Sequence, residues 1–109
     1  MKQLVEYLQQ KGIIFKSLKS IAPKEIGSRK RVGLYVGVDL RGYYALVIEI
    51  EKKSRFLQKD AKEMIDLHQR VQKYIDATIK SRYIIIKAPP LCSKAKAFLS
   101  EDGWRVFDE

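Results

Sequence analysis

The clearest pattern along this chain is a strict alternation of apolar residues between positions 32 and 40. Every second side chain there is apolar, namely Val32, Leu34, Val36, Val38 and Leu40. A period of two is that of a β-strand with one buried face. A second apolar arm runs from Tyr43 to Glu51, and the Arg41-Gly42 step between the arms is typical of a turn. The segment therefore predicts an antiparallel hairpin.

Segments with helical spacing lie on either side of the hairpin. Residues 2–11 place Leu4, Val5 and Leu8 on one face, and Gly12 follows as a natural stop. From Asp60 to Ile79 another set of apolar residues shares one face, namely Met64, Leu67, Val71 and Ile75. Asp60 and Glu63 resemble a capping box at the start of this segment. We expect a short opening helix and, after the hairpin, a helix of about five turns.

Shorter segments complete the predicted order of elements. Ile13 to Phe15 predicts a brief strand, and the apolar run from Tyr83 to Ile86 predicts a strand covered on both faces. Ser93 to Leu99 can form a helix after the Pro89-Pro90 break, and Gly103 to Phe107 a final edge strand. The order indicates one α/β domain over residues 1–109. In it the 83–86 strand is central and is reached by a parallel crossover.

The charge of the chain favours a polyanionic partner. Its 109 residues contain 22 Lys and Arg against 13 Asp and Glu, which gives a formal net charge of +9. Fields of this size favour nucleic acid, although a basic surface can also serve solubility alone. No apolar run approaches the roughly 20 residues of a membrane span, and the opening segment lacks the apolar block of a signal peptide. We therefore expect a cytoplasmic protein that does not bind membranes.

Two basic groups flank the hairpin in the sequence. The first lies between Lys16 and Arg31, a segment that we expect to be irregular, and comprises Lys24, Arg29, Lys30 and Arg31. The second follows the hairpin and comprises Lys52, Lys53, Arg55, Lys59 and Lys62. Lys and Arg at such positions bind phosphates without reading sequence, which predicts shape-selective binding of duplex or branched DNA. The alternative is a solvated charged loop and helix start.

Charged residues also gather where the second arm of the hairpin ends. Glu49, Glu51 and Lys53 share one face of this strand, whose other face is apolar. A strand that simply leaves the core and becomes solvated has the same pattern. This segment alone therefore does not distinguish a functional site from a solvated strand end.

Five segments acquire meaning when they are taken together and in order. They are YLQQKGIIFKS, GSRKRVGL entering the hairpin, YYALVIEIEKK at its exit, the IIIK strand and GWRVF near the end. In this order they resemble the PD-(D/E)XK nucleases, and most closely the archaeal Holliday-junction resolvases. The resemblance implies a restriction-endonuclease-like mixed sheet flanked by helices, a DNA partner and a tendency to form homodimers. It also implies an Mg²⁺ site with an acid on each hairpin arm and a lysine two residues after the second acid.

This chain departs from the family pattern at most of the site positions. Glu49 matches the second-arm acid, but the lysine position falls on Glu51 and the first-arm acid on Gly33. The acid that the family often carries in the opening helix would fall at or before the first residue. Asp39 cannot replace the first-arm acid, because it pairs near Tyr43, roughly 20 Å from Glu49 at about 3.3 Å per residue.

Three functions follow from these observations. The first is a DNA-binding protein with a resolvase-like fold that is weakly active or inactive as a nuclease. The second is an active endodeoxyribonuclease with a displaced catalytic site of Glu49, Glu51 and Lys53, in which Glu49 and Glu51 hold Mg²⁺. The third is a protein-interaction module of a larger complex. RNA as the ligand, and a partner that supplies the missing groups, also remain open.

The single histidine and the single cysteine predict neither zinc nor an internal disulfide. We interpret His68 as a surface or helix-packing residue rather than a general base. Cys92 is interpreted as a buried small residue rather than a nucleophile.

Overall fold

The computed structural model describes residues 2–51, 54–87 and 90–108. Its elements, in chain order, are α1 (Lys2–Gln10), β1 (Phe15–Ile21), the 3-10 helix η1 (Pro23–Ile26), β2 (Val32–Asp39), β3 (Tyr44–Ile50), α2 (Gln58–Ile75), β4 (Ile79–Ile86), α3 (Ser93–Glu101) and β5 (Arg105–Asp108). Apart from η1, this is the order that the sequence predicted.

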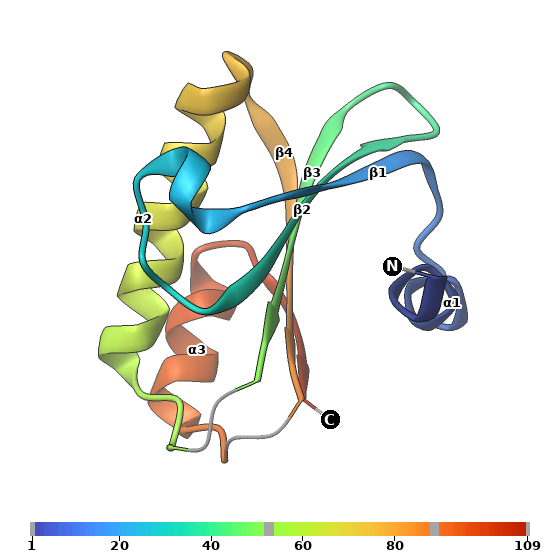
Figure 1. The fold of residues 1–109 in the computed structure, drawn as a ribbon. Helices are drawn as coiled ribbons and strands as arrows, with labels where there is room; N and C mark the ends of the chain where they lie inside the picture. The colour runs from blue at the N-terminus through green and yellow to red at the C-terminus, as the bar shows by residue number, and fades with distance from the viewer. Residues whose placement is uncertain (1, 52–53, 88–89, 109) are drawn as a thin grey trace.

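The strands form one five-stranded mixed sheet in the order β1-β2-β3-β4-β5 (Figure 1). β1, β2 and β3 are antiparallel neighbours, whereas β4 runs parallel to β3 and β5 runs parallel to β4. The predicted α/β class, hairpin, parallel crossover and final edge strand are therefore confirmed. The prediction that the 83–86 strand is central is confirmed in that β4 lies inside the sheet between β3 and β5, while β3 is the middle strand of the five.

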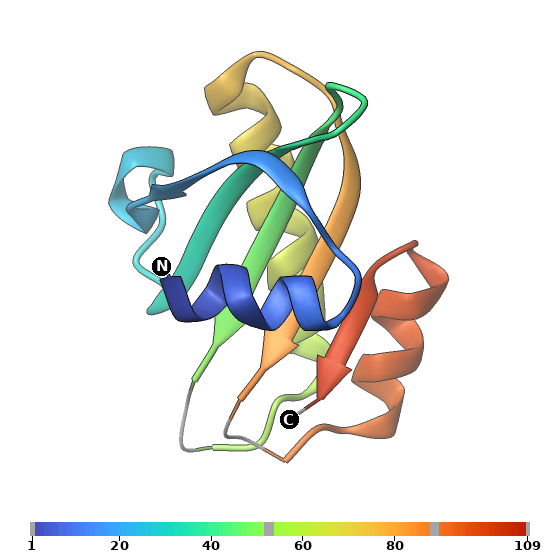
Figure 2. The same ribbon diagram turned by 90° about the vertical axis from the view of Figure 1, so that its right-hand side faces the viewer.

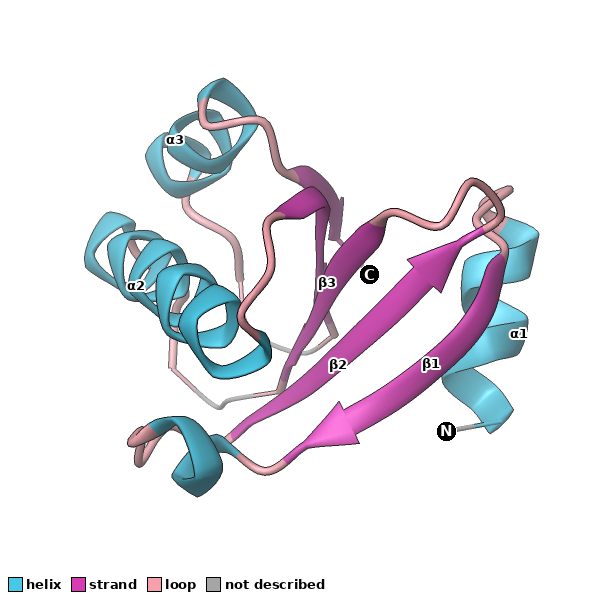
Figure 3. Cartoon of the chain, turned by 90° about the horizontal axis from the view of Figure 1, so that it is seen from above, coloured by secondary structure: helices cyan, strands magenta, loops and turns pink. Residues whose placement is uncertain are grey.

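Helices cover both faces of the sheet. α2 and α3 pack on one face and α1 lies on the other, as the views in Figures 1 and 3 agree. The larger core lies under α2 and α3, and the smaller one under α1 comprises Leu4, Leu8, Ile13, Val47 and Ile85. Because side chains alternate along a strand, Glu49 shares with Val47 the face that α1 covers. Within the described ranges, no helix is long and apolar enough to cross a membrane.

β1 is longer than the sequence pattern indicated. We predicted a strand over 13–15 and an irregular segment over 16–31, whereas β1 extends to Ile21 and the irregular basic loop covers only residues 27–31. β1 is an edge strand with exposed Lys and Ser side chains, and its pairing with β2 shifts register between Phe15 and Ser17. A polar edge and a register shift both erase the period-two signal on which the prediction depended.

α2 begins two residues before Asp60 and ends four residues before Ile79, so both predicted ends were wrong. At the start, Oδ2 of Asp60 accepts a hydrogen bond from the Leu57 backbone N–H at 2.7 Å. Asp60 is thus a capping residue, but its partner is Leu57 and not Glu63. At the end, Asp76 has a left-handed φ of 53°, which terminates the helix. Ile79 keeps the helical spacing of the apolar residues although it begins β4.

Candidate nucleic-acid interface

The register of the β2–β3 hairpin decides which side chains meet at its open end. Gly33 pairs with Glu49, as the sequence predicted. Asp39 lies at the other end, where its Oδ1 accepts hydrogen bonds from the backbone N–H groups of Arg41 and Tyr43, each at 2.9 Å. Asp39 therefore stabilises the turn, and the prediction that it cannot serve as the first-arm acid is confirmed.

Glu49 has two polar neighbours that the sequence analysis did not identify. Its Oε2 lies 2.7 Å from Nζ of Lys87, and its carboxylate accepts a hydrogen bond from the Tyr35 hydroxyl. The backbone N–H of Lys87 donates to the carbonyl of Ile50 at 2.9 Å, which fixes Lys87 beside the end of β3. The Glu49 side chain is 14% exposed and that of Lys87 is 45% exposed. The Glu49 side chain is therefore largely covered, while that of Lys87 is partly exposed.

Gly33 leaves the space that this arrangement needs. A Cβ at position 33 would lie 3.2 Å from Cε2 of Tyr35 and 3.3 Å from Oε1 of Glu49, closer than ordinary van der Waals contact. Without that Cβ, the Tyr35 ring and the carboxylate can lie against the strand. Burial, followed by the hydrogen bond to Glu49 and its negative charge, raises the pKa of Tyr35 to about 12. The hydroxyl is therefore a donor to Glu49 at any pH near neutrality.

The residues at this end of the sheet do not fit an Mg²⁺ site. Glu49 already has the ammonium of Lys87 as its cation, Gly33 offers no ligand, and Glu51 is exposed beyond the end of β3. Lys53 lies outside the described residues. Across 2–51, 54–87 and 90–108, no three His, Cys, Asp or Glu side chains gather into a group that could hold a metal ion. Among the residues that the structure describes, the acid pair and lysine that the family resemblance requires are thus not brought together.

This chain has an endonuclease-like fold. It is similar to the structure of EndoMS in apo form, with a TM-score of 0.55 and 16% sequence identity over 99% of this chain and 45% of that one. It is also similar to a repair endonuclease from Pyrococcus abyssi, with a TM-score of 0.52 and 17% identity over 100% of this chain and 45% of that one. A complex of EndoMS with double-stranded DNA matches with a TM-score of 0.50 and 14% identity over 99% and 43% of the two chains.

At these identities the likeness establishes the fold alone. This chain spans less than half the length of each of the three solved structures. No protein-family model matches the sequence, and a search of curated proteins finds no match either. The function therefore has to be argued from the side chains that this endonuclease-like fold brings together.

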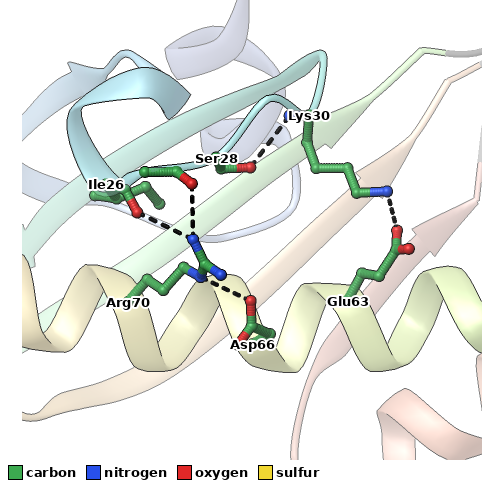
Figure 4. Close-up of polar contacts among 7 residues, drawn as sticks. Ile26, Ser28, Lys30, Glu63, Asp66 and Arg70 are labelled. Atoms are coloured by element: carbon green, nitrogen blue, oxygen red, sulfur yellow. Dashed lines mark hydrogen bonds and ion pairs between the residues drawn. The ribbon is translucent and has the colours of Figure 1, made fainter.

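The basic loop that enters β2 is held against α2 (Figure 4). NH1 of Arg70 donates to the carbonyls of Gly27 at 2.8 Å and Ile26 at 3.4 Å, and Lys30 forms an ion pair with Glu63. A depression of about 290 Å³ lies between the loop and α2 and is lined by Gly27, Ser28, Arg29, Lys30, Glu63, Asp66, Leu67 and Arg70. The loop is thus an ordered part of the endonuclease-like fold, and Glu63 compensates the charge of Lys30.

The other predicted basic residues at this end are exposed. Arg31 directly precedes Val32, which pairs with Ile50, so it enters the sheet at the end where Glu49 lies. Arg29, Arg55, Lys59 and Lys62 are also exposed. The Lys62 ammonium lies 5.9 Å from the centroid of the Phe98 ring. The structure therefore brings most of the two predicted basic groups to one end of the sheet, next to the start of α2.

Lys24 lies apart from this group, and Lys52 lies outside the described residues. η1, which carries Lys24, packs near the last turns of α2, where Arg70, Lys73 and Tyr74 line a shared depression with Glu25 and Ile26. Lys59 lies in the first turn of α2, about 22 Å from Tyr74 at 1.5 Å per residue. Lys24 is therefore separated from the basic residues near the start of α2, because η1 lies beside the opposite half of that helix.

Lys87 is the site residue that the sequence analysis missed. It ends the IIIK segment, which was used for the family resemblance, but no role was assigned to it. The available signal was topological, since β3 and β4 are parallel and Glu49 pairs with Ile85. Residues just after the ends of two parallel neighbours lie side by side, so Lys87 was a candidate neighbour of the Glu49 end.

His68 and Cys92 are the single histidine and the single cysteine of the chain. His68 is buried and packs edge-on against Trp104, with ring centroids 6.1 Å apart, which confirms the helix-packing interpretation. Cys92 is half-buried just before α3, not fully buried as expected. The backbone N–H groups of Ala95 and Lys94, in the first turn of α3, lower the pKa of the Cys92 thiol because they favour the thiolate at the start of a helix.

Proposed function

We propose that this chain binds double-stranded or branched DNA on a PD-(D/E)XK-type scaffold and cleaves it weakly or not at all. The observation that carries the proposal is the group of exposed basic side chains at the Glu49 end of the sheet, namely Arg29, Arg31, Arg55, Lys59 and Lys62. Such side chains contact backbone phosphates, which gives affinity and salt dependence without sequence readout.

The fold and the overall charge support a DNA partner. One of the similar structures is a complex of EndoMS with double-stranded DNA, and another is a repair endonuclease. The net charge of +9 on 109 residues attracts polyanions over the whole molecule. The order of segments that resembles the PD-(D/E)XK nucleases agrees with the same partner.

The surroundings of Glu49 argue against efficient metal-dependent cleavage. Two acids from opposite hairpin arms would have to converge on the metal, but Glu49 faces Gly33. The carboxylate of Glu49 is also neutralised by Lys87 at 2.7 Å. A divalent ion would have to displace this ammonium and would find one carboxylate in place of two.

Binding is tested by fluorescence anisotropy with labelled duplex, four-way junction and single-stranded DNA at several salt concentrations. We expect the duplex and the junction to bind at low salt, with log Kd rising linearly with log salt. Absence of binding at low salt would remove the proposal. A weak affinity that is independent of salt would instead favour the protein-interaction module.

Cleavage is tested on the same DNA in Mg²⁺ and in Mn²⁺, and we expect the strands to remain intact. The second candidate function is an active endonuclease. One observation favours this second function: the Glu49–Lys87 pair brings together an acid and a lysine, which are two of the groups that such a catalytic site needs. Robust cleavage that disappears in Glu49→Ala would establish this second function in place of the first.

A further inference from the structure

We propose that Lys87 is the resident cation of this site, taking the place of a divalent metal beside Glu49 and binding a phosphate of the DNA backbone. The proposal rests on the DNA binding argued above and assigns the residue that anchors the phosphate nearest to Glu49. It accounts for three observations together: the Gly33–Glu49 pairing, the Lys87–Glu49 ion pair and the Tyr35 hydrogen bond.

The charges of Glu49 and Lys87 balance each other. A site with one acid on each arm of the hairpin has two negative charges and needs a divalent cation to neutralise them. Here the second-arm acid, Glu49, faces Gly33, so a single negative charge remains at this pairing. One ammonium group neutralises it, and the Nζ of Lys87 lies 2.7 Å from Oε2 of Glu49. The loss of the first-arm acid and the presence of Lys87 are therefore complementary.

The two partners of this ion pair differ in exposure. The Glu49 side chain is 14% exposed and that of Lys87 is 45% exposed, so Lys87 is the more accessible partner for a phosphate that approaches from solvent. An ammonium has several N–H donors and can bind a carboxylate and a phosphate oxygen at the same time. β3 and β4 also extend past α1 at this end of the sheet, so that helix does not cover the ends of the two strands (Figure 2).

The Glu49 carboxylate also has Tyr35 as a second partner. The Tyr35 hydroxyl donates to Glu49, and its raised pKa keeps it protonated. The bare Cα of Gly33 lets this ring and the carboxylate approach each other. Lys87 is itself fixed by its backbone hydrogen bond to Ile50. Ordered partners on both sides lower the entropy cost of presenting the ammonium to a ligand.

The test compares three variants in the anisotropy assay with duplex DNA over a salt series. Lys87→Gln should weaken binding and reduce the salt slope by about 1, the value for one lost phosphate contact. Glu49→Gln should bind as tightly as the wild type or more tightly, because it removes a negative charge beside the phosphate and keeps the ammonium. Lys87→Arg should retain the affinity. Thermal melting of each variant shows whether it is folded.

The control is Lys80→Gln, at the other end of β4. Lys80 is exposed, and its ammonium lies 3.8 Å from the centroid of the Tyr43 ring. The change removes the same charge as Lys87→Gln, but near the opposite end of β4. We expect a smaller loss of affinity than in Lys87→Gln. A merely structural ion pair predicts a different pattern, in which Lys87→Gln and Glu49→Gln both lower the melting temperature and affect DNA binding in the same direction. That result would overturn the proposal.

The experiment also separates the two proposals. If the wild-type protein does not bind DNA at low salt, the proposed function fails and the assignment of Lys87 fails with it. If the wild-type protein binds and a folded Lys87→Gln variant keeps its affinity and its salt slope, the assignment of Lys87 fails alone. If Lys87→Gln is unfolded, the variants Lys87→Arg and Glu49→Gln still test the assignment. A loss of DNA binding in both would contradict the proposal that Lys87 binds a phosphate.

Discussion

Gly33 lies directly opposite Glu49 across the β2–β3 hairpin, and a Cβ added to it would lie 3.3 Å from both the Cβ and the Oε1 of Glu49. The position that would carry the first-arm acid is thus close enough to Glu49 to share a ligand with it. Glycine there removes the second carboxylate and, at the same time, makes room for Tyr35. The geometry of a two-acid site is present, while its second charge is absent.

The first prediction is that restoring the second acid and removing the ammonium creates a site for a divalent ion. Gly33→Asp combined with Lys87→Gln places two carboxylates on facing strands without a competing cation. Because the new side chain is tightly packed, we expect a loss of stability of about 1–3 kcal/mol. Isothermal titration calorimetry should detect Mn²⁺ binding to this variant and none to the wild-type protein.

The matched control for that experiment is Gly33→Asn combined with Lys87→Gln. Asparagine has nearly the same size and shape as aspartate but carries no charge. It should cost similar stability and should not bind Mn²⁺ with comparable affinity. If the two folded double variants bind Mn²⁺ equally well, or if neither binds it, positions 33 and 49 do not form the metal-binding pair that we infer.

The second prediction concerns the basic loop. Arg29→Glu combined with Arg31→Glu should weaken DNA binding strongly and leave the melting temperature within a few degrees, since both residues are exposed on a loop. Lys30 is left unchanged, because reversing its charge would also break its ion pair with Glu63 and so affect stability as well as binding. Anisotropy and thermal melting measure the two properties separately.

Its control reverses the same number of charges at the far end of the molecule. Arg41, at the hairpin turn, and Lys80, at the start of β4, are both exposed. Arg41→Glu combined with Lys80→Glu lowers the net charge equally, so it measures the general electrostatic effect. If the two double variants lose the same affinity, the loop is not part of a localised interface.

The fold was predictable where the apolar pattern is strong and local. The strict alternation over 32–40 set the strand, and with the turn signal at Arg41-Gly42 it also set the register that pairs Gly33 with Glu49. β1 was missed because it is an edge strand, where Lys and Ser are favoured and a register shift breaks the alternation. A single sequence does not distinguish such a strand from a basic loop.

The site was only partly predictable, since its contacts join elements far apart in the chain. Glu49 was identified from the family pattern, but its partner Lys87 lies 38 positions later. The pairing depends on the parallel register of β3 and β4, which apolar periodicity does not specify. Likewise, the hydrogen bond of Arg70 to Gly27 depends on how α2 packs on the sheet. The sequence therefore did not predict that the basic loop is held in one conformation.

The third prediction is that Arg70→Ala destabilises the protein by about 1 kcal/mol. Its NH1 donates to the Gly27 carbonyl at 2.8 Å, and its Nε donates to Asp66 at 2.8 Å. The net contribution of a hydrogen bond from a charged donor is of this order once partial exposure is allowed for. Asp66→Ala, the control, removes only the exposed ion pair and should cost about 0.5 kcal/mol or less. Urea unfolding measures both, and equal losses would mean that Arg70 does not hold the loop.

The fourth prediction concerns the pH dependence of stability through His68. Burial, followed by the positive charge of Arg82, lowers the pKa of His68 in the folded protein, although Asp102 and the backbone of Ile79 act in the opposite direction. Between the ordinary value near 6.5 and the lower folded value, the unfolded chain binds a proton that the folded chain does not. The free energy of unfolding should therefore fall as the pH is lowered from about 7 towards 5.

Carboxylates and other groups also titrate in this range, so the comparison with His68→Gln isolates the histidine. Glutamine cannot take up the proton, and the variant should lose less stability than the wild-type protein between pH 7 and pH 5. The variant will be less stable at pH 7, since it lacks the edge contact with Trp104 at 6.1 Å. The informative quantity is therefore the slope of the free energy of unfolding against pH. Urea unfolding curves at half-unit steps of pH give that slope for both proteins. Parallel slopes would mean that His68 keeps an ordinary pKa in the folded state and that the buried contact with Trp104 does not exclude its protonated form.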